Sequence, residues 1–114
     1  MNTATPAITE PSAPSPEVAT AFADLDRART RLRDADDNCG RERRAFRRFA
    51  YKHKLSLREA RSAMRASDPE GYLVFIRAEI EAANALRAFR RIAMIAAITR
   101  VVDTDRRLTA ERAA

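Results

Sequence analysis

Apolar residues recur along most of the chain at alternating intervals of four and three, the spacing that gathers side chains on one face of an α-helix. The first seam is Val18, Phe22, Leu25, Arg29, Leu32, Asp36, Cys39, Arg43, Phe46, Ala50 and His53, and polar residues degrade it at Arg29, Asp36 and Arg43. Because this seam passes Gly40 without a shift, it predicts one long helix over about residues 16–54. The alternative is a break in the polar segment 36–40, where glycine would follow a helix end.

Two helix-start signals follow the first seam. Ser56 and Glu59 have the spacing of a capping box, in which each side chain accepts a hydrogen bond from the other residue's backbone N–H. They predict a short helix that ends near Ala66. Ser67 and Glu70 repeat the same spacing around Pro69.

The second signal predicts a last helix over about residues 69–110, which no proline interrupts. Both predicted connections are only a few residues long, and short connections favour antiparallel neighbours. We therefore predict an all-α fold, a long antiparallel helical hairpin with a short connecting helix. The predicted hairpin core is Phe22, Leu25, Leu32, Phe46, Phe49, Leu73, Ile76, Ile80 and Phe89.

The last predicted helix has an unusual apolar distribution. Leu73, Ile76, Ile80 and Ala83 make an ordinary stripe, but the residues between Ile92 and Val102 are apolar on nearly all sides. A helix of that kind has to be covered on every side. We expect self-association, or contact with another protein subunit, through this segment. Coverage by the first two helices alone is the alternative.

The first residues of the chain differ in composition from the rest. Residues 1–16 are rich in proline, serine, threonine and alanine, which predicts a disordered tail before a helical domain over residues 17–112. Cys39 is the only cysteine, so no intramolecular disulfide can form. No signal peptide or membrane span is visible, and we expect a cytoplasmic protein.

Positive charge is concentrated in residues 41–65. This segment holds ten Lys or Arg residues and two Glu, a net charge of +8 in a chain whose total is +6. On a helical projection, Phe46 and Phe49 share one face, and the basic residues spread over the opposite side, centred near Tyr51. The short helix repeats the arrangement with arginines at three and four residue intervals.

This basic face predicts contact with nucleic-acid backbone, because a row of guanidinium groups neutralises several phosphates at once. The predicted contact residues are Arg41, Arg44, Arg47, Arg48, Tyr51, Lys52, Arg58, Arg61 and Arg65. We expect RNA or single-stranded DNA, bound without base specificity. Tyr51 could stack on a base, although partly buried packing is the interpretation we favour for it. An acidic protein partner or a solvated polar face are the alternatives for the segment.

A double-stranded DNA-binding function is a further alternative. Residues 41–54 and 57–66 could form a helix-turn-helix with Arg58, Arg61, Ser62 and Arg65 facing the major groove. The connection lacks the frequent glycine, and acidic residues open the next helix.

Motifs for metals and catalysis are incomplete. Asp34, Asp36 and Asn38 imitate a calcium loop, but its glycine is one place late and Ala45 stands where a Glu is required. His53 has no Cys or His partner at zinc-ligand spacing, which favours a boundary residue of the helix. We expect no metal, no cofactor, no small-molecule substrate and no enzymatic activity.

The segments RERRAFRRFAYKHK (41–54) and REARSAMR (58–65), set in an all-helical chain, resemble the small subunits of CRISPR effector complexes, particularly those of type IV systems. The resemblance covers about residues 18–110. It implies a non-catalytic subunit whose copies stack along a ribonucleoprotein and hold nucleic acid through basic, sequence-independent contacts. Phage small terminase subunits and plasmid partition or relaxosome accessory proteins share this composition and remain alternatives.

Overall fold

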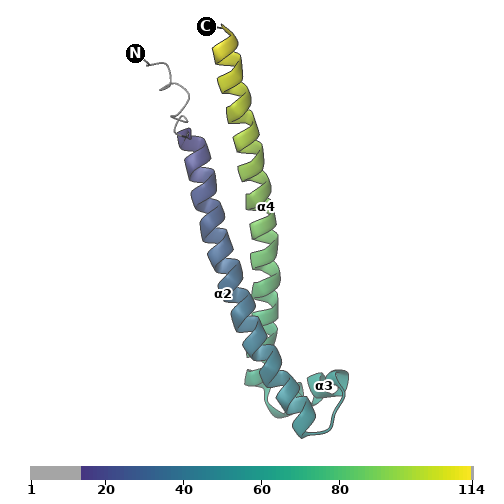
Figure 1. Ribbon diagram of the computed structural model, residues 1–114. Coiled ribbons are helices and arrows are strands. Elements are labelled where there is room, and N and C mark those ends of the chain that lie inside the picture. The colour runs from purple at the N-terminus through teal and green to yellow at the C-terminus, as the bar shows by residue number, and fades with distance from the viewer. Residues whose placement is uncertain (1–13, 114) are drawn as a thin grey trace, which may run out of the picture.

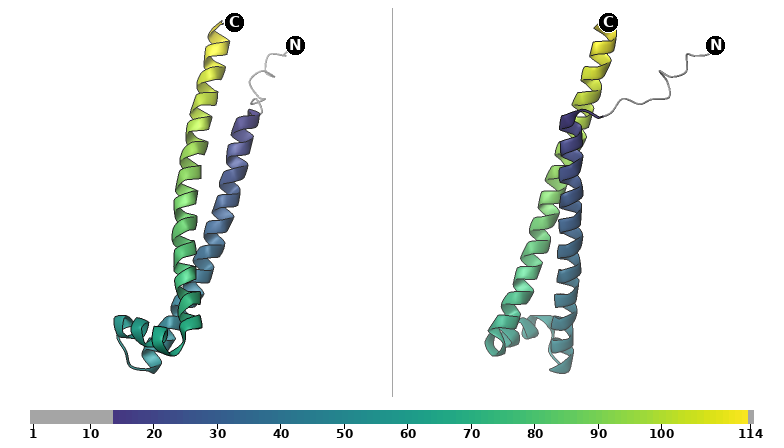
Figure 2. Two further views of the ribbon diagram at one scale, coloured as in Figure 1. Left: turned by 180° about the vertical axis from the view of Figure 1, so that it is seen from behind. Right: turned by 90° about the vertical axis from the view of Figure 1, so that its left-hand side faces the viewer.

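The computed structural model describes residues 14–113, which form three helices and no strand in that part of the chain (Figure 1). They are α2 (Pro16–Lys52), α3 (Leu57–Ser67) and α4 (Pro69–Ala113). The long helices α2 and α4 lie antiparallel at a shallow angle, and α3 lies across the tip where they are joined (Figure 2). The predicted all-α hairpin is confirmed. Most of the predicted tail, residues 1–13, is outside the described residues.

Helix α2 is one continuous element. It begins after Ser15, whose Oγ accepts a hydrogen bond from the N–H of Val18 at 3.3 Å. It passes through Gly40 as regular helix, so the alternative of a break at residues 36–40 is wrong. It ends at Lys52, two residues earlier than predicted, because the chain turns at Lys54 with a left-handed φ of 55°.

The face of α2 that packs on α4 alternates large and small side chains. Its buried residues are Val18, Ala21, Leu25, Ala28, Ala35, Cys39, Phe46 and Ala50. The three polar positions that degrade the predicted seam, Arg29, Asp36 and Arg43, are exposed. The alanine one place before Arg29, and the one before Asp36, occupy the interface instead. Small side chains at these positions let the two helix backbones approach each other closely.

Helix α4 contributes a matching row of small residues. Its buried residues are Phe75, Ala78, Ala85 and Ala96. Leu73 and Ile80 are 47% and 54% exposed, so their assignment to the core was wrong. The error arose because large apolar residues lie on several sides of α4, while alanines mark the side that meets α2.

The remaining predicted core residues lie in or beside two clusters. In the upper half, Leu25 packs with Ala21 and Ala96, and the half-buried Phe22 and Phe89 lie against them. At the tip, the second cluster is Phe46, Ala50, Ala60 and Phe75, flanked by Phe49, Leu55, Met64 and Ile76. Leu32 is half-buried between the clusters.

The capping box predicted before α3 is present. Ser56 Oγ accepts a hydrogen bond from the N–H of Glu59 at 3.1 Å, and Glu59 Oε1 accepts one from the N–H of Ser56 at 3.0 Å. The backbone N–H and then the hydroxyl of Ser56 lower the pKa of the Glu59 carboxyl below its ordinary value. The box thus fixes where α3 begins.

The second predicted cap is displaced by one residue. Ser67 is the last residue of α3, and its hydroxyl donates a hydrogen bond to the carbonyl of Ala63 at 2.7 Å. Asp68 takes the capping role, since its carboxylate accepts a hydrogen bond from the N–H of Gly71 at 3.1 Å. The proline that follows disfavours a helical conformation at Asp68, which makes this residue the boundary.

Within residues 14–113, no helix has the length and apolar character that a membrane crossing requires.

Candidate nucleic-acid interface

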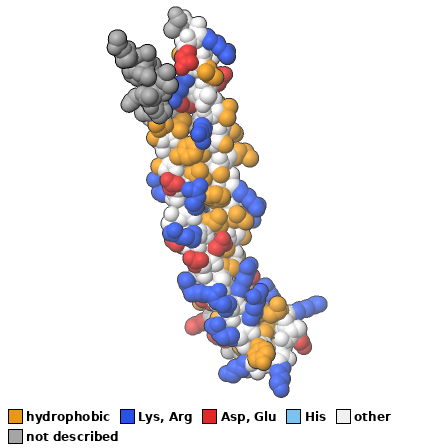
Figure 3. Space-filling view, viewed as in Figure 1, with side chains coloured by type: hydrophobic (Ala, Val, Ile, Leu, Met, Phe, Trp, Pro, Cys, Tyr) orange, Lys and Arg blue, Asp and Glu red, His pale blue; other side chains and the backbone are white. Residues whose placement is uncertain are grey.

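The basic end of the molecule is the part formed by residues 41–65, at the tip of the hairpin. Lys and Arg side chains gather there over the lower part of α2 and over α3, whereas apolar side chains dominate the upper surface (Figure 3). All nine predicted contact residues are exposed. They are Arg41, Arg44, Arg47, Arg48, Tyr51, Lys52, Arg58, Arg61 and Arg65.

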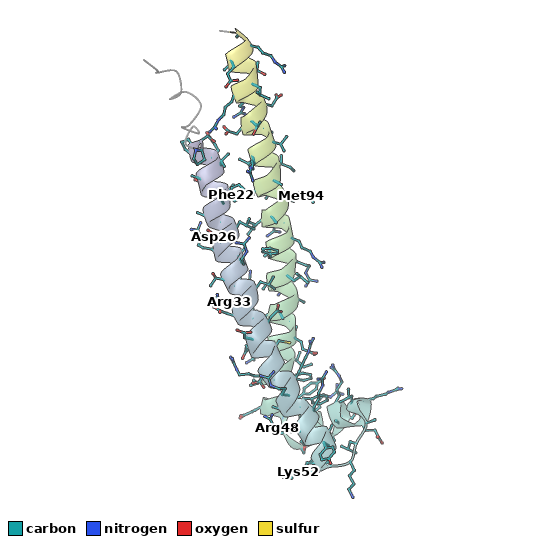
Figure 4. The ribbon with its side chains drawn as sticks, viewed as in Figure 1. Phe22, Asp26, Arg33, Arg48, Lys52 and Met94 are labelled. Atoms are coloured by element: carbon teal, nitrogen blue, oxygen red, sulfur yellow. The ribbon has the colours of Figure 1, made fainter. Side chains whose placement is uncertain are left out.

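The aromatic core of the tip sets the direction of these side chains. Phe46 and Phe75 stack with ring centroids 4.6 Å apart and planes 9° from parallel. Since Phe46 fixes the inward side of α2, residues half a turn away point outward. Arg48 and Lys52 lie on this lower segment of α2 (Figure 4). On α3, burial of Ala60 likewise leaves Arg58 exposed.

Few of these charges are neutralised by the protein. Two of the ten Lys and Arg residues in the basic end form an ion pair within residues 14–113, and both pair with Glu79. Arg43 Nε is 3.8 Å and Arg61 Nη2 is 3.5 Å from the carboxylate oxygens of Glu79. Arg41 donates only to the neutral side chain of Asn38, at 3.5 Å. The arrangement can therefore bind an anion without first breaking internal ion pairs.

Arg61 differs from the other predicted contact residues. Its guanidinium lies over the rings of Phe46 and Phe75, 5.9 Å and 5.4 Å from their centroids. Together with the ion pair to Glu79, this position ties α3 to both long helices. Arg61 thus stabilises the packing of the tip. The helix-turn-helix alternative therefore has one fewer arginine available to contact bases.

Tyr51 is 88% exposed, so the interpretation of this residue as partly buried packing is wrong. The helical projection had placed it at the centre of the basic face, and the structure agrees with that projection. Its ring has no aromatic partner among the described residues. It is free to stack on a planar group.

Two residues of the tip, Phe75 and Glu79, were not predicted as members of the site. Glu79 is one of several carboxylates of α4, and Phe75 was passed over in favour of its neighbours. Their roles depend on how the two long helices are paired, since α4 brings them beside Phe46 and Arg61. Only knowledge of the register between α2 and α4 would have identified them.

The remaining candidates for chemistry are Cys39, His53 and the acidic side chains. Cys39 is buried in the α2 seam as a small apolar residue, as predicted. His53 lies just after α2 with its ring 4.6 Å from that of Phe49, so it is the predicted boundary residue. Among residues 14–113, no three His, Cys, Asp or Glu side chains are placed to hold a metal ion.

Comparison with known proteins adds no relative. No family model matches the chain, and no curated protein or solved structure is similar to it.

Proposed function

We propose that the basic end binds the phosphate backbone of a nucleic acid, with single strands favoured and without base specificity. The observation that carries the proposal is the absence of ion pairs for eight of its ten Lys and Arg residues within the described chain. Mutual repulsion of so many neighbouring charges destabilises the fold, and a bound polyanion relieves it.

The other half of α2 supports this interpretation by contrast. Its four arginines, at positions 27, 29, 31 and 33, each form an ion pair with a carboxylate. The same helix therefore neutralises its arginines where six Asp and Glu residues accompany them and leaves them unpaired where carboxylates are scarce. A solvated face with no ligand would not need this separation.

The chemistry of the exposed groups favours backbone contact over base readout. Guanidinium groups bind phosphate oxygens bidentately, and these contacts carry no sequence information. Tyr51 adds a ring that can stack on any unpaired base, since every base has a π-face. Both features suit a single strand better than a defined duplex site.

The test is the salt dependence of binding to a random single-stranded oligonucleotide. If about four phosphates are neutralised, the log–log slope of affinity against salt is near −3. Substituting Arg44, Arg48 and Arg58 together with Gln should weaken binding and make the slope shallower by about 2. The matched control changes Arg27, Arg29 and Arg33 to Gln and removes the same net charge from the paired half.

The proposal requires that the control keeps nearly the wild-type slope. A slope of zero, or equal losses in both variants, contradicts a localised interface. Strong preference for one duplex over random competitor would instead support the helix-turn-helix alternative. If the variant at Arg44, Arg48 and Arg58 instead loses bound protein partners while its nucleic-acid content is unchanged, the chain is an adaptor for an acidic protein.

We further propose that the chain acts as a non-catalytic subunit of a larger ribonucleoprotein, which is the role implied by the resemblance to CRISPR small subunits. The supporting feature is the large apolar surface that the monomer leaves uncovered. Purification from the native host tests it. Nuclease treatment should detach the protein from its companions if nucleic acid links them.

A further inference from the structure

The side of α4 that faces away from α2 carries a second apolar row. Met94, Ile98 and Val101 are 65%, 55% and 67% exposed, and Figure 4 shows Met94 on the side of α4 opposite α2. They belong to a sequence of positions at four and three residue intervals, which we call the outer stripe. Its members are Arg87, Arg91, Met94, Ile98, Val101, Asp105 and Leu108.

The outer stripe refines the expectation that all of the segment from Ile92 to Val102 needs an outside partner. Ala96 is buried against α2, and Ile92 is partly covered there. The uncovered part is the outer stripe together with the neighbouring Ile95. Its spacing is that of a coiled-coil seam, so the shape of its complement is another helix with the same spacing.

The charges at the ends of the stripe indicate which helix fits. Arg87 lies near one end and Asp105 near the other, both are exposed, and neither forms an ion pair within residues 14–113. They are 18 residues apart on one helix, about 27 Å, which is too far for them to meet within a chain. A helix of the same sequence laid antiparallel brings each opposite its counterpart.

We propose that the outer stripe pairs with the outer stripe of a second copy of this chain, with the two α4 helices antiparallel. In this register Met94 lies beside Ile98 of the partner subunit, and Arg87 lies beside Asp105 of the partner subunit. The two-fold axis passes near residue 96. Each symmetric pair occurs twice, so one dimer gains two ion pairs at the flanks of an apolar centre.

Other arrangements of the same two helices are less favourable. A parallel pair would place Arg87 and Arg91 each against its own copy, which is repulsive. An antiparallel shift by one heptad sets Asp105 against Met94 of the partner subunit. The opposite shift covers Ile98 with Arg87 of the partner subunit. The proposed register also sets Arg91 beside Val101 of the partner subunit, but it alone of the three antiparallel registers joins unlike charges and keeps Met94 beside Ile98.

The proposal does not depend on nucleic-acid binding. It does place the two basic ends at opposite extremes of an elongated dimer whose body is four long helices. The reason is that each α4 runs from the basic end of its own chain towards the basic end of the partner chain. Such a dimer can contact two separate stretches of one strand.

Sedimentation equilibrium of the full-length chain tests the proposal. At micromolar concentration the wild-type mass should be twice that of one chain. Ile98→Glu should give a monomer with unchanged helical circular dichroism, because the side chain is exposed in the monomer. Leu73→Glu, at an exposed apolar position of α4 outside the paired segment, should leave the dimer intact.

A charge exchange tests the orientation. Arg87→Asp and Asp105→Arg each turn two attractive pairs into repulsive ones and should raise the dimer Kd on the order of tenfold. The double variant should restore the wild-type Kd, and only an intermolecular antiparallel pair explains such rescue. A wild-type monomer at hundreds of micromolar overturns the proposal. Tighter association of Arg87→Gln overturns the antiparallel register, because neutralising this side chain relieves a repulsion only where arginine faces arginine.

Discussion

Arginine is ion-paired in one half of the hairpin and mostly unpaired in the other. In the paired half of α2, residues 16–40, four arginines accompany six Asp and Glu residues, and every arginine forms an ion pair. In the basic end, ten Lys and Arg residues accompany two Glu, and only Arg43 and Arg61 are paired. An overall preference for arginine would explain its abundance in both halves. It does not explain why six carboxylates accompany four arginines in one half while only two accompany ten Lys and Arg residues in the other.

The halves also differ in how their helices are joined. The buried residues of the upper cluster are alanines and Leu25, with the half-buried Phe22 and Phe89 beside them, whereas the basic end is held by the buried, stacked rings of Phe46 and Phe75. Exposed ion pairs contribute little to stability, so the pairing in the upper half mainly lowers its electrostatic potential. The aromatic contacts at the tip have to offset repulsion among the unpaired charges. We expect the tip to depend strongly on a few side chains.

The largest expected effect is therefore that of Phe75→Ala. This ring of α4 is almost fully buried against Phe46 of α2 and Ala60 of α3, and its removal should lower the free energy of unfolding by about 3–5 kcal/mol. Chemical denaturation gives the value. Amide hydrogen exchange should accelerate more over α3 than over residues 18–35, because α3 is held to the long helices by this cluster.

Phe75→Leu serves as the second variant if the alanine protein does not fold. It keeps most of the buried volume and should cost less stability while still losing the stacking on Phe46. Uniform acceleration of exchange along the hairpin would show that the tip is not a separately sensitive region.

A smaller effect of opposite sign is expected at Gly40, where the paired half meets the basic end. A Cβ added there would have Arg44 Nη1 as its nearest side-chain atom, at an ordinary contact distance of 3.5 Å. Because glycine weakens a helix interior, Gly40→Ala should raise the free energy of unfolding by about 0.5–1 kcal/mol. A thermal melt measures it. Destabilisation would mean that the long helix needs a flexible point between its halves.

Features that depend on local sequence were predictable in both halves of the hairpin, and contacts between helices were not. The continuity of α2, the capping box at Ser56 and the outward basic face all rest on local periodicity, and all were predicted correctly. The alanine seam was not predicted, because Ala28 and Ala35 give a weaker apolar signal than the Phe and Leu residues beside them.

The contacts of Arg61 with Glu79 and Phe75 at the tip could not be predicted from local sequence patterns. Arg61 meets Glu79 and Phe75 only because α4 folds back beside α2, and no spacing within one helix encodes that contact. The basic face as a set of exposed residues was therefore predictable. The division of its members into paired and unpaired arginines was not.

Glu79 offers a sharper comparison of the two halves. Glu79→Gln releases both Arg43 and Arg61, and it should strengthen binding of a single-stranded oligonucleotide while lowering stability by less than about 1 kcal/mol. Asp26→Asn is the matched control, since it adds the same charge and releases Arg29 in the paired half. Binding at several salt concentrations distinguishes them. Equal gains from both variants would mean that only net charge matters.

The smallest expected effect concerns acid stability. The hydrogen bonds from Arg31, at 3.0 Å, hold the pKa of Glu81 below its ordinary value of 4.5 in the folded protein. A carboxyl whose folded pKa is depressed stabilises the fold above its unfolded pKa, and this contribution is lost as the pH falls through the folded pKa. Glu81→Gln should therefore flatten the decline of Tm below about pH 4.5.

Glu59 should behave in the same direction for a different reason, since the N–H of Ser56 rather than an arginine lowers its pKa. Glutamine can replace Glu in a capping box, so Glu59→Gln removes the titration and keeps the acceptor. The effect of added salt on the acid dependence of Tm then distinguishes the two halves. Screening should shrink the acid dependence that comes from the Arg31–Glu81 pair more than the dependence that comes from the cap, because only the former joins two exposed opposite charges. If salt reduces the acid dependence from Glu81 and that from Glu59 equally, the charge attraction between Arg31 and Glu81 does not contribute to the stability of the paired half.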